Sequence, residues 1–334
     1  MIAAPAGMLR GLLWASLAVL IAATYPVITR LGVTRQAMTP LELATLRFVV
    51  AAVVLSPVLV AMLRRLDRRG WTEAALLTLC QGTPLATLIA GGLALAPAAH
   101  GSALTLGLMP AITILLRSAG GERFAPRALV GATLIAAGAA CLAGLDMQAG
   151  GGSLLGHGMF VLAAVMGSTY FLRLRRSGFT ATEGAAIVAG LSAVGGVLAL
   201  ALIGGLGRLA QVAPGDLLLQ AVFQGVLVGV AAMVALNQAI VLLGPTAATV
   251  CLSLVPATAA LLALPVLGEA SSLGEWLAFA AMVLGAALAA ACERRAVTPQ
   301  SGASNSPGRP ERRPAWIKHL KLVLRLADGR AGAA

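Results

Sequence analysis

The sequence predicts an all-α integral membrane protein with ten transmembrane helices, arranged as two inverted five-helix repeats. Of its 334 residues, 59% are hydrophobic and only 11% are charged, whereas roughly a quarter of the residues in soluble domains are charged. The apolar residues form runs of about twenty, the length that crosses a bilayer as a helix. The alternating pattern of a transmembrane barrel is absent. A set of short phrases also occurs twice in the same order.

Ten apolar runs are long enough to be spans. They cover residues 9–29, 41–63, 73–96, 100–118, 126–145, 153–173, 183–204, 217–243, 246–267 and 273–292. The first run is longer than a signal-peptide core and more spans follow it, so we expect it to be retained.

Arginine is distributed unevenly between the alternate loops. With both termini in the cytoplasm, eleven arginines before the tail lie on the cytoplasmic side, and Arg30, Arg35 and Arg208 lie on the other. This bias follows the positive-inside rule and favours an even number of spans. The net charge of +12 is therefore read as a topology signal, and nucleic acid is not an expected partner.

The tail, residues 296–334, is basic and differs from the rest of the chain. Its segment 298–314 is rich in Pro, Ser and Gly and is typical of a flexible linker. Apolar residues recur with helical spacing in 315–327, between lysines and an arginine. We expect either a short amphipathic helix on anionic inner-leaflet lipids or a disordered basic end.

The repeated phrases define two halves. LMPAITILLRSAGGE (108–122) matches LVPATAALLALPVLGE (254–269), and TPLE (39–42) is echoed by TATE (180–183), at offsets between 141 and 147 residues. The sequence thus divides into repeats at 1–148 and 149–295. Five is an odd number of spans, so the second copy is inverted relative to the first. This symmetry is typical of transporters that work by alternating access around a midplane site.

Two prolines occupy equivalent places in the halves. Pro110 and Pro256 fall within the fourth and ninth spans, where each removes a helix hydrogen bond. In lipid the freed carbonyl must be satisfied by protein or by a wet cavity. Either these helices are broken to line a cavity, or the prolines make packing kinks.

The residues that carry these patterns resemble the drug/metabolite transporter superfamily, EamA-like family. The resemblance lies in TLRFVVAA (45–52), in the phrase from Leu-x-Pro to Gly-Glu in both halves, and in LLGPTAATVCLSLVP (242–256). It covers about residues 9–292. It implies two inverted five-helix repeats and the export of small metabolites, such as amino acids, across a bacterial inner membrane.

Polar residues inside the spans are the candidates for substrate binding. Gln81 and Gln224 are equivalent in the third and eighth spans, and Asn237 adds an amide. A buried amide needs a partner, so these side chains line the pathway or join helices. Arg47 is the one clearly embedded charge; it either attracts a carboxylate-bearing solute or extends to the interface.

The two tyrosines, Tyr25 and Tyr170, are also equivalent between the halves. They are either paired gates or interfacial anchors. Thr105 and Ser253, which precede the two prolines, either line the cavity or are hydroxyls that pack between helices.

Acidic residues and histidines fall near span ends, and the sequence suggests no His/Asp/Glu cluster. We therefore expect no catalytic residue, no metal and no cofactor. Glu122 and Glu269 are expected to cap the helix that follows each of them. The cysteines have no ligand or disulfide spacing.

The function that fits best is a secondary transporter, not an enzyme, with a small-molecule substrate and the lipid bilayer as partners; a homodimer is compatible with the sequence. The alternatives are a membrane-embedded lipid-processing enzyme, which would need acid, base or metal groups, and a non-transporting scaffold that docks through its tail.

Overall fold

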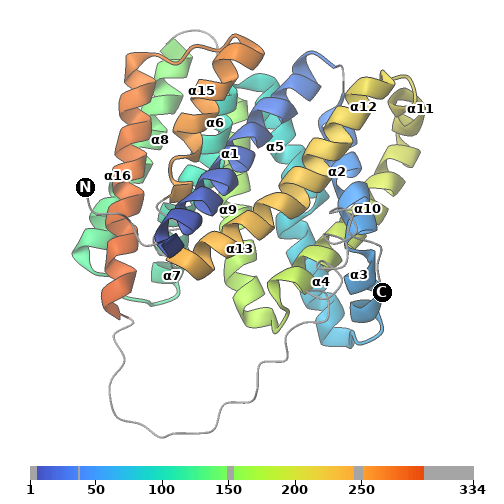
Figure 1. The fold of residues 1–334 in the computed structure, drawn as a ribbon, viewed down its shortest axis with the longest axis horizontal. Coiled ribbons are helices and arrows are strands. Elements are labelled where there is room, and N and C mark those ends of the chain that lie inside the picture. The colour runs from blue at the N-terminus through green and yellow to red at the C-terminus, as the bar shows by residue number, and fades with distance from the viewer. Residues whose placement is uncertain (1–5, 37, 149–153, 244–250, 297–334) are drawn as a thin grey trace, which may run out of the picture. The chain divides into compact units, whose positions relative to one another are not determined.

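In the computed structural model, residues 6–36, 38–148, 154–243 and 251–296 are described, and they fold into helices joined by short connections (Figure 1). Within these ranges there is no strand. Seven of the described helices are long and apolar enough to cross a membrane, or eight if α2 and α3 form one bent span. The chain is therefore an all-helical membrane protein, and the count of ten spans stays a prediction. The tail lies outside the described residues.

The first half contains eight α-helical segments and one π-helical turn. They are α1 (Ala6–Thr34), α2 (Pro40–Val54), α3 (Ser56–Leu63), α4 (Arg68–Gln81), α5 (Thr83–Leu95), α6 (Ala98–Ser102), η1 (Ala103–Gly107), α7 (Met109–Ala119) and α8 (Pro126–Gln148).

The second half contains a long π-helical segment. Its elements are α9 (Leu154–Ser177), α10 (Ala181–Leu202), α11 (Gly205–Leu209), α12 (Pro214–Gln220), η2 (Ala221–Ala231), α13 (Ala232–Leu243), α15 (Val255–Leu267) and α16 (Leu273–Ala296).

Two apolar runs of the first half are broken. Helices α2 and α3 meet at Leu55 with a bend of 78°, and α4 and α5 meet at Gly82. A proline stands in the first turn of α3 and of α5, where its missing N–H costs nothing. At the second break the Thr83 N–H and hydroxyl both bond to Ser192 of α10, at 3.1 and 2.9 Å.

The echo of TPLE and TATE has a structural cause. Thr39 and Glu42 form a capping box at the start of α2, and Thr180 and Glu183 form the same box at the start of α10. In each box the threonine hydroxyl accepts from the glutamate N–H and the glutamate carboxylate accepts from the threonine N–H. Equivalent helices of the two halves thus begin alike.

Packing between the halves is also paired. The contact of α1 with α13 has its counterpart in that of α9 with α5, and the contact of α1 with α15 in that of α9 with α7. Likewise, α2 packs on η2 as α10 packs on α4. Helices α2 and α10 contact each other, as do α8 and α16. Exchanging the halves therefore converts each of these contacts into another contact of the same set.

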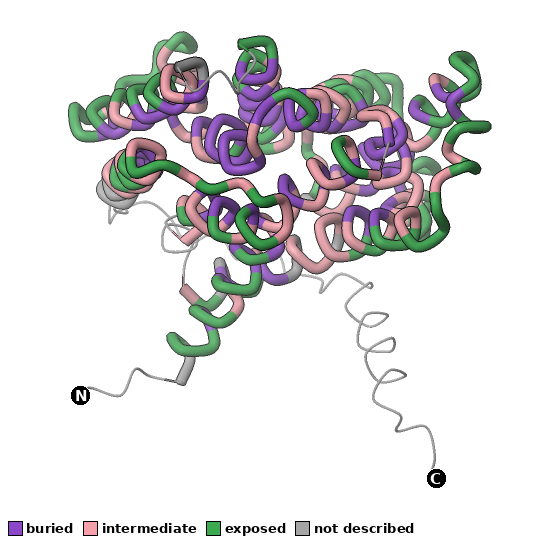
Figure 2. The backbone as a smooth tube through the Cα atoms, turned by 90° about the horizontal axis from the view of Figure 1, so that it is seen from above, coloured by how far each residue is buried: buried purple, intermediate pink, exposed green. Residues whose placement is uncertain are grey.

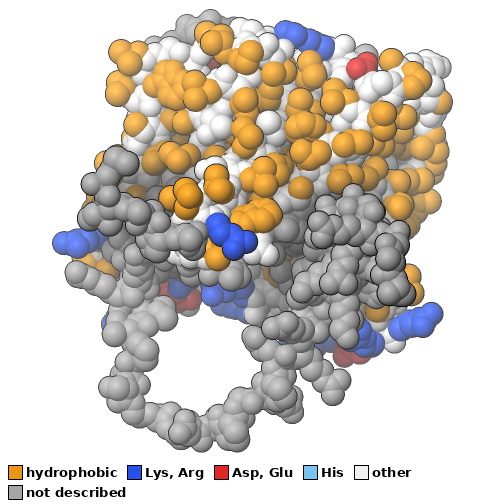
Figure 3. Space-filling model, in the orientation of Figure 1, with side chains coloured by type: hydrophobic (Ala, Val, Ile, Leu, Met, Phe, Trp, Pro, Cys, Tyr) orange, Lys and Arg blue, Asp and Glu red, His pale blue; other side chains and the backbone are white. Residues whose placement is uncertain are grey.

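Charge marks one end of the helices, which we call the basic end. The α3–α4, α7–α8 and α9–α10 connections lie there, at the lower edge of Figure 1. Its arginines are Arg64, Arg65, Arg68, Arg69, Arg117, Arg123, Arg127, Arg173, Arg175 and Arg176. The α15–α16 connection lies at the other end, called here the opposite end. In Figure 3 hydrophobic side chains cover most of the surface between the ends, as expected for contact with lipid.

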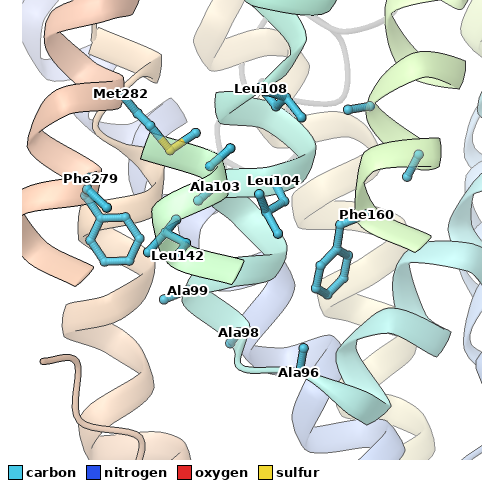
Figure 4. Close-up of a cluster of buried hydrophobic side chains, with 14 of the residues drawn as sticks. Ala96, Ala98, Ala99, Ala103, Leu104, Leu108, Leu142, Phe160, Phe279 and Met282 are labelled. Carbon is cyan, nitrogen blue, oxygen red and sulfur yellow. The ribbon is translucent and has the colours of Figure 1, made fainter. Parts of the chain in front are cut away.

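The largest buried apolar cluster surrounds α6 and η1. In Figure 4, Leu142 of α8, Phe160 of α9 and Phe279 of α16 lie around this short segment. Each of the three side chains is at most 1% exposed. Figure 2 shows the same pattern along the chain: buried stretches lie on the sides of helices that face one another.

Helices α8 and α16 approach to backbone contact through Gly131 and Gly285. A Cβ on Gly131 would stand 2.5 Å from the Gly285 carbonyl oxygen, and a Cβ on Gly285 would stand 2.6 Å from the Gly131 oxygen. No side chain fits at either position. Small residues that let backbones meet are the usual basis of helix association in membranes.

Candidate functional site

Arg47 of α2 lies over an aromatic ring of α1. Its guanidinium carbon is 4.9 Å from the centre of the Tyr25 ring and 5.6 Å from that of Phe48. Both distances are within the range of a cation–π contact. Two predicted site residues, Arg47 and Tyr25, are thus brought together, with the charge held against the side of α1.

Gln224 belongs to a chain of side-chain hydrogen bonds. It is 3% exposed, and its Nε2 donates to Thr29 Oγ1 at 2.9 Å and to Gln220 Oε1 at 3.1 Å. Gln220 Nε2 in turn donates to Gln36 Oε1 and to the Ile28 carbonyl. These bonds join η2 and α12 to α1, so Gln224 has the interhelical role that the sequence left open.

Gln81, its equivalent, has a different environment. Its Oε1 is buried and has no hydrogen-bond partner among the described residues. This atom lies 3.9 Å from where a Cβ on Gly167 of α9 would stand, next to Met109 of α7. The amide therefore faces the space between α4, α7 and α9 with an unused acceptor.

The same three helices enclose a cavity at the basic end. Its volume is about 330 Å³, and three arginines contribute to its walls. The lining residues are Arg69, Glu73, Leu116, Thr169, Leu172, Arg173 and Arg176. The Arg173 and Glu73 side chains pair across it at 3.2 Å. A cavity with this lining favours an anionic group.

The remaining predicted site residues are dispersed. Tyr170 is 6% exposed, packed with residues of α2, α4 and α10, so its ring does not face lipid. Thr105 lies in η1 and donates to the Gly101 carbonyl. Ser253 is half-buried in the turn before α15. Asn237 is in α13, and its side chain lies outside the described part of the structure.

Both predicted prolines start a helical segment. Pro110 is in the first turn of α7, directly after η1, and Pro256 is in the first turn of α15. At these positions proline has no intrahelical N–H bond to lose. The interruption in the fourth run is the π-helical turn η1, a feature that often marks functional sites.

The repeated Gly-Glu phrase has a common geometry and unlike partners. Gly121 and Gly268 have φ values of 90° and 78°, a conformation that favours glycine, so each ends its helical segment sharply. Glu122 then pairs with Arg117 at the basic end. Glu269 pairs with Arg30 of α1.

Glu269 does not cap the helix that follows it, so that expectation was wrong. Its Oε2 accepts from the Ala98 N–H at 3.0 Å, at the start of α6, while Ser272 and Glu275 form the box that starts α16. Arg30 completes the group by donating to the Leu93 and Ala96 carbonyls. We call Arg30, Glu269 and these backbone groups the Arg30 cluster.

Further polar contacts join the two halves at the opposite end. Arg35 Nη2 donates to the Leu267 carbonyl at 2.8 Å, and Gln36 donates to Asp216 at 2.8 Å. Arg208 pairs with the buried Glu42 at 2.9 Å. With the Arg30 cluster, these bonds close the opposite end across the halves.

Sequence reasoning missed a histidine cluster. His100 and His157 lie near the ends of their spans as expected, but the expectation that the chain has no His/Asp/Glu cluster was wrong. They are 0% and 3% exposed and lie beside Asp146 and Glu275. The two histidines are 57 residues apart and meet only because α6 packs on α9, so no local motif announces them.

Comparison with known proteins agrees with this architecture. One solved structure, titled only as a crystal structure of a protein, has 24% identity and a TM-score of 0.55, over 86% of this chain and 99% of its own; at that identity it shows the fold alone. A search of curated proteins finds no match. The model of the EamA-like transporter family matches twice, over residues 9–144 and 154–291. Two matches that together span nearly all of the described helices place the chain in the EamA-like transporter family.

Proposed function

We propose that the protein is a secondary transporter that exports a small metabolite, such as an amino acid or a related compound, by alternating access. Membership of the family makes it a membrane transporter. The observation that carries the mechanism is the paired packing of the two halves. A molecule whose halves make equivalent contacts can exchange them, closing one end as it opens the other.

The two ends differ in the way this mechanism requires. At the opposite end Arg30, Arg35, Gln36 and Arg208 all bond to the other half. At the basic end Arg117 and Glu122 pair within one half, a single ion pair, Arg173 with Glu73, joins the halves, and a cavity of about 330 Å³ lies between α4, α7 and α9. This arrangement fits a transporter closed at the opposite end and accessible from the basic end.

The polar groups suggest the substrate class. The cavity arginines and the guanidinium of Arg47 favour a carboxylate, and the unused acceptor of Gln81 favours a donor such as an ammonium or amide. The surrounding helices are apolar. A small zwitterion with an apolar side chain suits such a pathway.

Placement in the membrane follows from charge. The positive-inside rule puts the basic end in the cytoplasm, with both termini there, in a bacterial inner membrane. Access from the basic end then corresponds to loading from the cytoplasm, which agrees with export. Single cysteines introduced at 121 and 270 should react with a membrane-impermeant reagent from opposite sides.

Flux measurements test the proposal. Purified protein in sealed proteoliposomes should move at least one compound of a panel of amino acids and related zwitterions, and cells that overproduce it should tolerate that compound. Empty liposomes are the control. Monodisperse, folded protein that moves no member of the panel would contradict the proposal.

A further inference from the structure

Four titratable side chains from four helices meet at the opposite end, away from the proposed pathway. They are His100 of α6, Asp146 of α8, His157 of α9 and Glu275 of α16. The two rings and the aspartate are each at least nine-tenths buried. Burying so many ionisable groups together is costly unless they are paired or coordinate a metal.

Three ligand atoms of this group form a triangle. His100 Nδ1 lies 3.2 Å from His157 Nε2, and Asp146 Oδ2 lies 3.5 Å from His157 Nε2 and 3.9 Å from His100 Nδ1. Tetrahedral zinc with bonds of about 2.0–2.2 Å places its ligand atoms about 3.3–3.6 Å apart. The triangle therefore has the size of one face of a zinc coordination tetrahedron.

The aspartate oxygen in this triangle accepts no hydrogen bond from the described residues. Asp146 Oδ2 is buried, the side chain is 7% exposed, and its nearest neighbours are the two histidine nitrogens. A buried carboxylate oxygen without a hydrogen bond is unfavourable. A cation held between the oxygen and the two ring nitrogens would remove that penalty.

Glu275 contacts His100 on the ring nitrogen that faces away from the triangle. Its Oε1 lies 2.7 Å from His100 Nε2, so that nitrogen carries the proton and Nδ1 presents its lone pair to the triangle. Glu275 Oε2 is held by the Ser272 N–H at the start of α16. In protein zinc sites, the ring nitrogen that does not bind the metal usually donates its N–H to a carboxylate, as His100 Nε2 does here.

A cavity lies next to the site. A cavity of about 440 Å³ at this end is lined by both Asp146 and Glu275, together with Pro97, Ala99 and residues of the α15–α16 connection. We expect an ion to enter from this side, with water as its fourth ligand, as in three-ligand zinc sites.

We propose that His100, His157 and Asp146 bind one divalent transition-metal ion, and that the ion is zinc. Two imidazoles and one carboxylate suit zinc better than the all-oxygen ions magnesium and calcium. His100 precedes the junction of the halves and His157 follows it. Bound metal thus joins the two halves at the opposite end.

Metal binding to the purified full-length protein tests the site, with an affinity tag free of histidine. Parent protein should bind one Zn²⁺ per chain in equilibrium dialysis and give the visible absorption of tetrahedral Co²⁺. Asp146→Asn and His157→Asn should lose both signals. Glu275→Gln should weaken zinc binding about 10- to 100-fold.

His319→Asn is the matched control, because it changes the remaining histidine of the chain and should leave zinc binding unchanged. If a ligand variant fails to fold, the site is tested by two other results: the cobalt spectrum of the parent protein and the lower zinc affinity of Glu275→Gln. The proposal is overturned if the parent binds no zinc at micromolar concentration, if ligand variants bind it equally, or if His319→Asn abolishes binding. These measurements involve no flux, so they are independent of the transport proposal.

Discussion

The Arg30 guanidinium and the Glu269 carboxylate form an ion pair between residues 239 positions apart. The pair joins α1 to the α15–α16 connection, and both partners also bond to the backbone between α5 and α6. Their side chains are 18% and 23% exposed. The pair is therefore better shielded than a surface salt bridge and links the two halves directly.

Arg30→Gln and Glu269→Gln should each lower the free energy of unfolding by about 1.5–3 kcal/mol, the usual contribution of a hydrogen bond to a charged group. Denaturant titration in mixed micelles measures this, and the double variant should lose less than the sum of the single losses. Arg117→Gln is the control, because it removes the more exposed pair with Glu122 and should cost at most about 1 kcal/mol. Equal losses for Arg30→Gln and Arg117→Gln would contradict a special role for the Arg30 cluster.

The two equivalent glutamines should respond differently to the same substitution. Gln224→Leu strips hydrogen bonds from Thr29 and Gln220 and should destabilise the protein by about 1–3 kcal/mol. Gln81→Leu removes an acceptor that has no partner among the described residues, so it should leave stability nearly unchanged while flux falls. Thermal unfolding and proteoliposome flux, measured on both variants, separate the effects. If Gln81→Leu keeps full flux, Gln81 has no role in the pathway.

Arg47 should act through charge and shape together. Arg47→Gln should weaken the apparent affinity for carboxylate-bearing solutes about tenfold or more, which corresponds to the loss of one charge-assisted hydrogen bond. Arg47→Lys keeps the charge but loses the planar group over Tyr25, so it should recover only part of the affinity. Flux of the amidated solute, which lacks the negative charge, is the control and should change little in either variant.

Glycine contact between α8 and α16 gives a further prediction. Gly131→Ala and Gly285→Ala would each place a Cβ less than 3 Å from a backbone oxygen, so both should lower the melting temperature and the yield of folded protein. Gly144→Ala is the matched control in α8, because nothing lies within 4 Å of its added Cβ. That change should be neutral or stabilise by about 0.5–1 kcal/mol. Equal melting temperatures for all three variants would contradict the proposed backbone contact.

The sequence predicted most of the helix ranges because they depend on local composition. The runs at 100–118, 126–145 and 183–204 correspond within three residues to helical stretches of the structure, Ala98–Ala119, Pro126–Gln148 and Ala181–Leu202. It did not predict the breaks at Leu55 and Gly82, although Pro57 and Pro84 stand just after them. Those prolines were a usable signal, since proline favours the first turn of a helix.

The site was harder to predict because its contacts are not local. Gln81 and Gln224 are equivalent in sequence, yet Gln224 bonds to Thr29 and Gln220, whereas Gln81 Oε1 has no hydrogen-bond partner among the described residues. His100, Asp146 and His157 are likewise gathered by the packing of separate helices. Sequence periodicity and motif spacing carry no information about such contacts between residues of separate helices.

The meeting of Gly131 and Gly285 limits how the molecule can move. Backbones in contact along α8 and α16 have no intervening side chains to reorient, so these helices cannot slide or tilt apart without losing the contact. If the protein works by the proposed alternating access, we expect this pair to stay together while other helices move relative to it. The helix breaks at Leu55 and Gly82 are where the neighbouring spans change direction.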